Sequence, residues 1–228
     1  MILCKWDALP EKMRCDEVRE YYDILNSRKG SLIAKRIFDF IISLLMTIII
    51  SPILLVLIIL IKVDDSGPAF FRQVRVTTYG REFRIFKFRT MVVNAEKLGA
   101  QVTQGNDPRV TKIGHKLRKY RLDELPQLIN VITGDMSFVG TRPEVPRYVK
   151  FYSNEMLATL LLPAGVTSEA SITYKDENEL IGSADNPDKV YTEKVLPEKM
   201  KYNLDALKKF SFLAEIKTML KTVVAVIR

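Results

Sequence analysis

The chain has 228 residues, of which 47% are apolar and 27% are charged, with a net charge of +8, one histidine and two cysteines. This composition fits one domain, or a domain with an appendage, and excludes disorder and a disulfide scaffold. One histidine excludes a multi-histidine metal site within a single chain, and two isolated cysteines argue against a zinc site. Unpaired thiols are typical of a reducing compartment, taken here as the cytoplasmic side. Any catalysis would therefore depend on carboxylates, arginines and lysines.

A membrane segment is predicted near the N-terminus. Residues 40–61 form 22 consecutive positions without a formal charge, most of them apolar. As a helix rising about 1.5 Å per residue, the segment is long enough for a hydrocarbon core of about 30 Å. It starts too late and is too long for a cleavable signal peptide, which leaves a buried helix of a soluble protein as the alternative.

Ser51 and Pro52 interrupt the middle of this segment. Proline lacks an N–H and clashes with the carbonyl of Ile48, so we expect a kink there, with the Ser51 hydroxyl satisfying the freed backbone group. Each half spans less than about 20 Å and cannot cross alone. The flanks 20–39 and 62–81 each carry four lysines or arginines, so neither end favours the outer side. A re-entrant helix hairpin satisfies both observations, and a kinked helix that crosses the membrane is the alternative.

The positive charge is concentrated directly after the membrane segment. Residues 62–121 hold 14 lysines and arginines against five acidic residues, and the rest of the chain is almost neutral. A basic block beside a membrane suits anionic lipid headgroups, phosphorylated substrates or nucleic acid.

A β-hairpin is predicted within this basic block. Residues 70–76 and 81–89 are rich in aromatic and branched side chains and flank a turn with Gly80. The period of two places Lys87 and Arg89 on the same face as the apolar residues before them. These two cations then lie either at the rim of a pocket or at a solvated strand end.

Further along the chain, four more elements are predicted. Asp107 followed by proline predicts a helix N-terminus, and a second helix is expected near Asp123 with Pro126 in its first turn. Residues 163–197 are rich in glycine, proline and small polar residues and are expected to form a long functional loop with short structure inside it. From Phe212 onward an amphipathic helix is predicted, either packed on the core or lying at a membrane surface.

The pattern that points to chemistry is Arg118, Arg121, Asp123 and Glu124 within seven residues. Arginines would lower the pKa of Asp123 and bind phosphate oxygens, and an ionised aspartate can attack phosphorus or ligate Mg²⁺. The alternative is that Asp123 only caps a helix and the arginines are its surface partners.

Five blocks follow one another along the chain: Lys35–Asp39 before the apolar segment with Ser51-Pro52, then Gly67–Gln73, Lys87–Met91, Leu122–Val131 and Gly134–Pro143. Together they resemble the bacterial sugar transferases, the small monotopic phosphoglycosyl transferases that act on a polyprenyl phosphate. The resemblance covers nearly half of the chain, from residue 35 to residue 143. Agreement of ordered blocks over this length is far more specific than any one of them.

The resemblance implies a reaction and roles for named residues. Such enzymes transfer a sugar-1-phosphate from a UDP-sugar to undecaprenyl phosphate and release UMP, as the first membrane step of O-antigen, capsule, exopolysaccharide or glycoprotein glycan synthesis. The position of Asp123 is the nucleophile, which carries a covalent phosphosugar and lies at the required Mg²⁺, and Glu124 assists it as a base or a positioning group. The phosphate-binding positions are Lys87, Arg89, Arg118 and Arg142.

The resemblance also implies an architecture and a location. We expect a mixed α/β, mostly helical chain with an N-terminal arm (1–34) and a re-entrant membrane helix (35–62) broken at Ser51 and Pro52. A small cytoplasmic catalytic domain (63–228) would contain the β-hairpin and the C-terminal amphipathic helix. The protein would be monotopic on the cytoplasmic face of the bacterial inner membrane, with membrane lipids but no nucleic acid among its partners. Homo-oligomerisation is left open.

Two departures limit what can be transferred. Thr141 stands where the family usually has proline, and the segment 162–168 lacks the usual arginine and carries an extra alanine, Ala164. We therefore assign no nucleotide or sugar contacts to residues 160–180, and the sugar stays open. The competing interpretation is a non-enzymatic membrane module that uses residues 62–121 to bind anionic lipid or nucleic acid.

Overall fold

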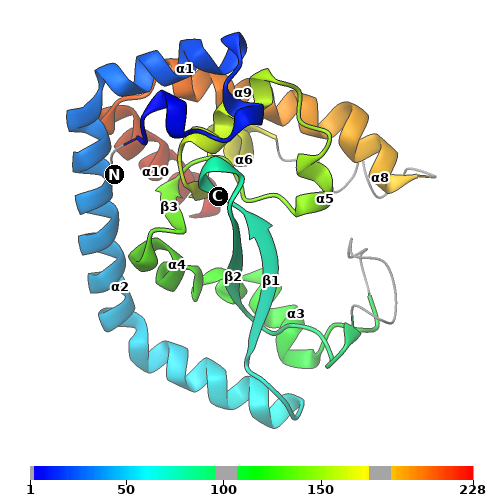
Figure 1. The fold of residues 1–228 in the computed structure, drawn as a ribbon. Coiled ribbons are helices and arrows are strands. Elements are labelled where there is room, and N and C mark those ends of the chain that lie inside the picture. The colour runs from blue at the N-terminus through cyan, green and yellow to red at the C-terminus, as the bar shows by residue number, and fades with distance from the viewer. Residues whose placement is uncertain (1–2, 96–106, 175–185, 228) are drawn as a thin grey trace.

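The computed structural model describes residues 3–95, 107–174 and 186–227, and it has far more helix than strand (Figure 1). The helices are α1 (Asp16–Ser27), α2 (Lys29–Asp64), α3 (Lys112–Lys119), α4 (Gln127–Thr133), α5 (Pro146–Val149), α6 (Glu169–Thr173), α8 (Pro187–Val190), α9 (Leu196–Lys208) and α10 (Phe212–Ile227). An antiparallel hairpin pairs β1 (Phe70–Val76) with β2 (Glu82–Phe88), and a parallel pair joins β3 (Met136–Val139) to β4 (Ala164–Thr167). The predicted mixed, mostly helical fold class and the hairpin are confirmed.

The membrane segment lies within α2, which runs along one side of the molecule and bends in its second half (Figure 1). Within the described residues, α2 is the one helix long and apolar enough to cross a membrane. Pro52 lies inside it and cannot donate to the Ile48 carbonyl, and the Ser51 hydroxyl donates to that carbonyl instead at 2.8 Å. The helix therefore stays continuous and bent, and does not divide into two separate helices.

Both ends of α2 pack against the same folded domain. In the N-terminal half, Lys35 donates to the Val139 carbonyl at 2.8 Å, and Asp39 accepts from the Ser137 hydroxyl at 2.7 Å. Near the C-terminal end, Leu57 packs in one cluster with Phe88, Leu117 and other buried side chains. Exposed apolar side chains lie between these contacts, at Leu44, Leu45, Met46, Ile48, Ile49, Ile53, Leu55 and Val56. The middle of α2 is thus the part available to lipid.

The N-terminal arm is an integral part of the core. Val18, Tyr21 and Leu25 of α1 are almost fully buried, in a cluster that includes side chains of α9. The Tyr21 hydroxyl also donates to Glu155 at 2.5 Å. Residues 16–27 therefore form a helix that belongs to the core.

The short structure expected inside the loop at residues 163–197 is present, but the described part from residue 187 onward is continuous helix and not loop. The segment contains β4, α6 and α8 and continues through a π-helical turn (Tyr191–Val195) into α9, while residues 175–185 lie outside the described structure. Pro187 and Pro197 stand in the first turns of α8 and α9, where a missing N–H costs nothing. Residues that usually break helices here begin them.

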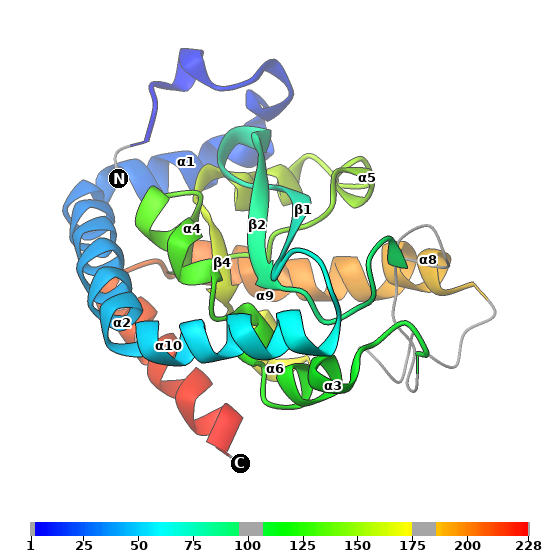
Figure 2. The ribbon, with the colours of Figure 1, turned by 90° about the horizontal axis from the view of Figure 1, so that it is seen from below.

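The C-terminal helix α10 lies beside α2 (Figure 2). Phe212 packs edge-on against Phe38 of α2, with ring centroids 5.6 Å apart. Leu213, Leu220 and Val224 are exposed. The predicted amphipathic helix is confirmed, and it carries apolar side chains on a second, uncovered face.

Two glycines allow β3 and β4 to approach closely. A Cβ placed on Gly165 would lie 2.2 Å from the Gly140 nitrogen and 2.3 Å from its carbonyl oxygen. The backbone here is fixed by hydrogen bonds from Gly140 N to Thr167 O at 3.0 Å and from Gly165 N to Thr141 O at 2.9 Å. This pairing places the segment that leads to Arg142.

We predict that Gly165→Ala lowers the free energy of unfolding by about 1–3 kcal/mol, because the added methyl group forces the two strands apart. Denaturation in detergent micelles measures the loss. Gly30→Ala is the matched control, since nothing lies within 4 Å of a Cβ at this exposed helical position. Equal melting of Gly165→Ala and wild type would contradict the tight strand contact.

Candidate active site

Three segments that are distant in sequence meet at the Glu124 carboxylate. Lys87, at the end of β2, donates to Glu124 Oε1 at 2.8 Å. Arg142, in the loop after β3, donates to the same oxygen at 3.4 Å. Glu124 itself lies in a 3-10 turn, Leu122–Glu124, between α3 and α4. The structure therefore brings together Lys87, Glu124 and Arg142, with Asp123 next to them.

The backbone around Asp123 differs from the helix start predicted there. Arg121 adopts left-handed dihedral angles, with φ of 54°, and so ends the run of α3 and reverses the chain. Pro126 is the residue before α4, which begins at Gln127. The Asp107 prediction is wrong as well, because α3 is capped by Thr111, whose hydroxyl accepts from Gly114 N at 3.0 Å. Asp107 instead forms an ion pair with Arg109 at 2.6 Å.

Glu124 is strongly biased toward its charged form. Burial alone would raise the pKa of this carboxyl, but the nearby cations Lys87 and Arg142 outweigh burial and hold the pKa at about 2. Burial lowers the pKa of the Lys87 ammonium, an effect that Glu124 opposes. The pair therefore consists of an ionised acid and a largely desolvated cation.

Asp123 behaves in the opposite way from the sequence-based expectation. Burial raises the pKa of Asp123 above its ordinary value, and the neighbouring Lys87 and Arg118 only partly offset this. The expectation that arginines would lower this pKa is therefore wrong, because desolvation is the larger effect. The Asp123 carboxylate makes no ion pair and no side-chain hydrogen bond with the described residues. It is half-buried, accepts a hydrogen bond from its own backbone N–H, and lies beside the cations Lys87 and Arg118.

The predicted phosphate-binding cations divide into two groups. Arg118 is close enough to Asp123 for a charge interaction, and its Nε donates to the Thr90 hydroxyl at 2.9 Å. The Arg142 side chain is 41% exposed and can reach a ligand. Lys87 and Arg118 thus act on Asp123, whereas Lys87 and Arg142 contact Glu124.

Arg89 occupies a different place. Its buried guanidinium donates to the Asp65 carboxylate at 2.6 Å and to the Asp65 carbonyl at 2.5 Å. Its Nε is buried without a hydrogen-bond partner in the described part of the chain. The alternation of side chains along a strand predicted that Lys87 and Arg89 share one face. β2 ends at Phe88, however, so Arg89 turns toward the end of α2. Here it connects the membrane helix to the hairpin.

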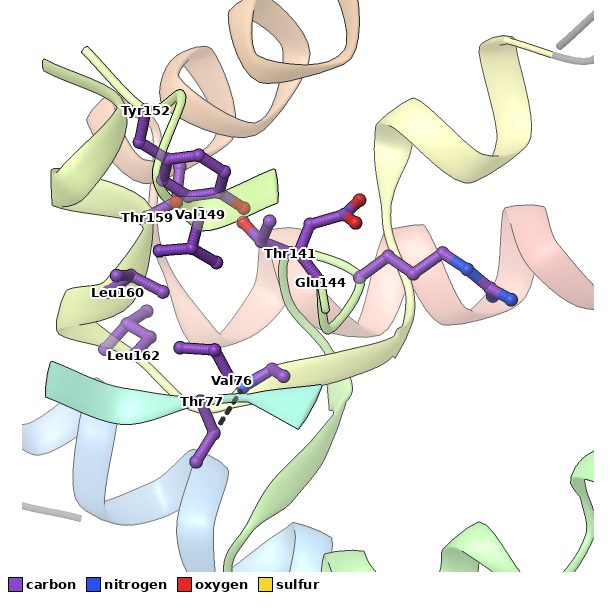
Figure 3. Close-up of a pocket in the computed structure, with 11 residues that line it drawn as sticks. Val76, Thr77, Thr141, Glu144, Val149, Tyr152, Thr159, Leu160 and Leu162 are labelled. Atoms are coloured by element: carbon purple, nitrogen blue, oxygen red, sulfur yellow. Dashed lines mark hydrogen bonds between the residues drawn. The ribbon is translucent and has the colours of Figure 1, made fainter. Parts of the chain in front are cut away.

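A small pocket adjoins the Arg142 loop on the side toward residues 149–162 (Figure 3). Thr141 faces Tyr152 there, and Val76, Leu160 and Leu162 contribute apolar walls. Thr141 and Ala164, the two positions that depart from the family pattern, both line it.

Arg75 was not singled out from the sequence. Its Nη1 donates to the Pro143 carbonyl at 3.0 Å, next to Arg142. The strand register was the available signal, because Arg75 pairs with Phe83 and therefore shares a face with Lys87, four residues further along β2.

We predict that Glu124→Gln changes the acid dependence of stability. A carboxyl whose pKa falls from 4.5 to about 2 on folding stabilises the protein above its unfolded pKa and loses that contribution as pH falls toward 2. The contribution is roughly 3 kcal/mol at neutral pH. Wild type should therefore lose more melting temperature than Glu124→Gln between pH 5 and pH 3. Glu198→Gln, at an exposed ion pair, is the control and should follow wild type; parallel curves for Glu124→Gln would contradict the prediction.

Comparison with known proteins identifies relatives. The chain is 40% identical over 157 residues to a UDP-N-acetylgalactosamine-undecaprenyl-phosphate N-acetylgalactosaminephosphotransferase of Aeromonas hydrophila, a match that covers 66% of this chain and 36% of that protein. It is 35% identical over 218 residues to the UDP-glucose:undecaprenyl-phosphate glucose-1-phosphate transferase of Escherichia coli K12, covering 93% and 44%. A putative undecaprenyl-phosphate N-acetylgalactosaminyl 1-phosphate transferase of Bacillus subtilis is 45% identical over 125 residues, covering 55% and 70%.

The chain thus spans less than half the length of the Aeromonas and Escherichia relatives and a larger share of the Bacillus protein. The model of the bacterial sugar transferase family matches residues 30–228, which includes α2, the hairpin and every residue of the candidate site. The chain belongs to the bacterial sugar transferase family.

Proposed function

We propose that this protein transfers a sugar-1-phosphate from a UDP-sugar to undecaprenyl phosphate and releases UMP. The observation that carries the proposal is the half-buried Asp123 carboxylate, which makes no ion pair with the described residues and lies beside Lys87 and Arg118, with Arg142 on the adjacent Glu124. A carboxylate surrounded by cations, each able to bind phosphate oxygens, suits attack on phosphorus. The relatives' names, which specify sugar phosphate transfer to undecaprenyl phosphate, support the same reaction.

The reaction proceeds in two displacements. An Asp123 oxygen forms a bond to the sugar-bearing phosphorus while the bond to the bridging oxygen breaks, and UMP leaves with that electron pair. An oxygen of undecaprenyl phosphate then attacks the same phosphorus and releases Asp123 as a carboxylate, giving the diphosphate-linked sugar. Burial of Asp123 favours the first step because a poorly solvated carboxylate loses less hydration as it attacks.

Glu124 acts as a positioning group in this scheme. A carboxyl with a pKa of about 2 accepts protons poorly near neutral pH, so it is badly suited to the role of general base. Its contacts with Lys87 and Arg142 instead hold both cations where the phosphoryl oxygens would lie.

The donor set fits a magnesium ion completed by substrate. Within the described residues no cluster of three or more potential ligand side chains exists. Mg²⁺ is commonly bound by one or two carboxylates together with substrate phosphates, and Asp123 is the uncommitted carboxylate for this purpose. When bound, the ion would neutralise charge on the phosphates. Lys87, Arg118 and Arg142 supply the remaining positive charge.

We further propose that α2 is re-entrant, so that the catalytic domain lies on the cytoplasmic face of the inner membrane. Support comes from the packing of Lys35 and Asp39 at one end, and of Leu57 and Ile61 at the other, on the same domain. A helix that crossed the bilayer would place these ends on opposite sides. The exposed apolar middle of α2 can then enter lipid, and the acceptor phosphate lies at headgroup depth near the basic site. The reaction would begin synthesis of a bacterial glycan.

We predict that Asp123→Asn reduces UMP release by roughly a thousandfold or more, because an amide is a poor nucleophile toward phosphorus. Purified protein, Mg²⁺, undecaprenyl phosphate and a panel that includes UDP-glucose and UDP-N-acetylgalactosamine provide the assay. With the UDP-sugar alone, mass spectrometry should find a phosphosugar on the wild-type peptide that contains Asp123. Asp205→Asn, at an exposed ion pair, is the control. Full activity of Asp123→Asn would exclude the nucleophile, and salt-sensitive lipid binding without any turnover would favour the non-enzymatic module.

We predict that cysteines introduced at both ends of α2 are reached only from the cytoplasmic side. Asp23→Cys and Ser66→Cys, each in a Cys4→Ala, Cys15→Ala background, are exposed positions that flank the helix. In intact cells, a membrane-impermeant maleimide should label neither until the membrane is permeabilised. Labelling of one position from outside but not the other would show that α2 crosses the membrane.

A further inference from the structure

Arg75 lies on the face of the hairpin that meets the candidate site. In the β1–β2 register, Arg75 pairs with Phe83, Gln73 with Ile85 and Phe71 with Lys87. Paired residues of antiparallel strands project to the same face. Arg75 and Gln73 therefore share the face of Lys87, although neither contacts Glu124 or Asp123 through a hydrogen bond in the described structure.

The hydrogen bonds of Arg75 fix the loop that carries Arg142. Arg75 Nη1 donates to the Pro143 carbonyl at 3.0 Å, and its Nε and Nη2 donate to Gln73 Oε1 at 3.1 and 2.7 Å. The next residue of β1, Val76, donates its N–H to the Glu144 carbonyl at 2.9 Å. The two residues that follow Arg142 are thus bonded to consecutive residues of one strand.

The charge of Arg75 is poorly compensated where it lies. Its guanidinium is largely buried, and burial lowers its pKa, while Glu144 and Glu124 oppose that effect from a distance. No carboxylate among the described residues forms an ion pair with it, and its hydrogen bonds go to neutral carbonyl oxygens. A buried cation without an ion-pair partner costs stability, so packing alone would be served better by an apolar side chain.

We propose that Arg75 is a positioning residue that holds the Arg142 loop so that Arg142 meets the diphosphate of the UDP-sugar. The proposal rests on the function proposed above, in which Arg142 binds phosphate oxygens. Arg75 acts through the Pro143 carbonyl and does not touch substrate. Gln73 orients the guanidinium by accepting two of its N–H groups.

A double-mutant cycle tests this role. Arg75→Met, Arg142→Met and the double variant are compared with wild type in two measurements, UDP binding by calorimetry and the KM and kcat for UMP release. We expect Arg75→Met to weaken UDP binding and to raise KM by on the order of tenfold or more in the wild-type background. In the Arg142→Met background the same change should have less than about a twofold effect, because the residue it positions is gone.

Two further variants control for charge and for folding. Arg72→Met removes a cation from the opposite face of β1, where Arg72 lies over the Phe86 ring, and should leave both measurements unchanged. Arg75→Lys keeps the charge and one donor for the Pro143 carbonyl, so it should recover part of the loss. If Arg75→Met does not fold in a melting experiment, the cycle is run with Arg75→Lys, for which a smaller non-additive effect is expected.

The outcomes separate this inference from the proposed function. Equal losses from the Arg75 variant in both backgrounds would show a purely structural role and overturn the inference, as would a variant with wild-type binding and KM. A wild-type protein that releases no UMP from any UDP-sugar would overturn the proposed function. Non-additive UDP binding in that case would still show that Arg75 acts through Arg142.

Discussion

The ionised Glu124 carboxylate is the contact on which the arrangement of the site depends. One of its oxygens accepts from Lys87 at the end of β2 and from Arg142 in the loop after β3. Hydrogen bonds from Arg75 and Val76 of β1 to Pro143 and Glu144 also hold the hairpin and the Arg142 loop together. The carboxylate between Lys87 and Arg142 offsets the repulsion between these two cations. Asp123 forms no ion pair with the described residues, because Lys87 and Arg142 already pair with the adjacent Glu124.

The membrane helix is coupled to the same site through β3. Lys35 and Asp39 of α2 bond to Val139 and Ser137 of this strand, which leads through Gly140 into the Arg142 loop. At the other end of α2, Arg89 holds Asp65 directly after the strand that carries Lys87. Both cations that contact Glu124 are thus within a few residues of an anchor to α2. The depth at which α2 lies in lipid would therefore set the height of the site above the bilayer, where the proposed acceptor, undecaprenyl phosphate, would carry its phosphate.

Much of this arrangement followed from the sequence, and the parts that did not have physical causes. Local patterns predicted the hairpin, the apolar helix and the Ser51 hydroxyl that compensates for Pro52, because each depends on neighbouring residues. Asp123 and Glu124 were located by family resemblance, since two adjacent acids alone are common. The helix predicted at Asp123 failed because the left-handed Arg121 is a tertiary feature without a local signal. The predicted fall in the pKa of Asp123 was wrong because burial cannot be read from residue spacing. The predicted placement of Arg89 beside Lys87 was wrong because its partner Asp65 lies at the end of α2.

The two adjacent carboxyls are pushed in opposite directions, and this divides their roles. Glu124 is the more deeply buried of the two, yet it receives two direct hydrogen bonds from cations, whereas Asp123 receives charge interactions from Lys87 and Arg118 without a hydrogen bond from either. An acid that is bonded in this way is stabilised as an anion and is a weak nucleophile, because its lone pairs are occupied. Asp123 is desolvated and accepts only a hydrogen bond from the backbone, so it keeps lone pairs available beside Lys87 and Arg118, cations that a phosphoryl group would require. Lys87 and Arg142 therefore stabilise Glu124 as a fixed anion and leave Asp123 as the carboxylate proposed to react.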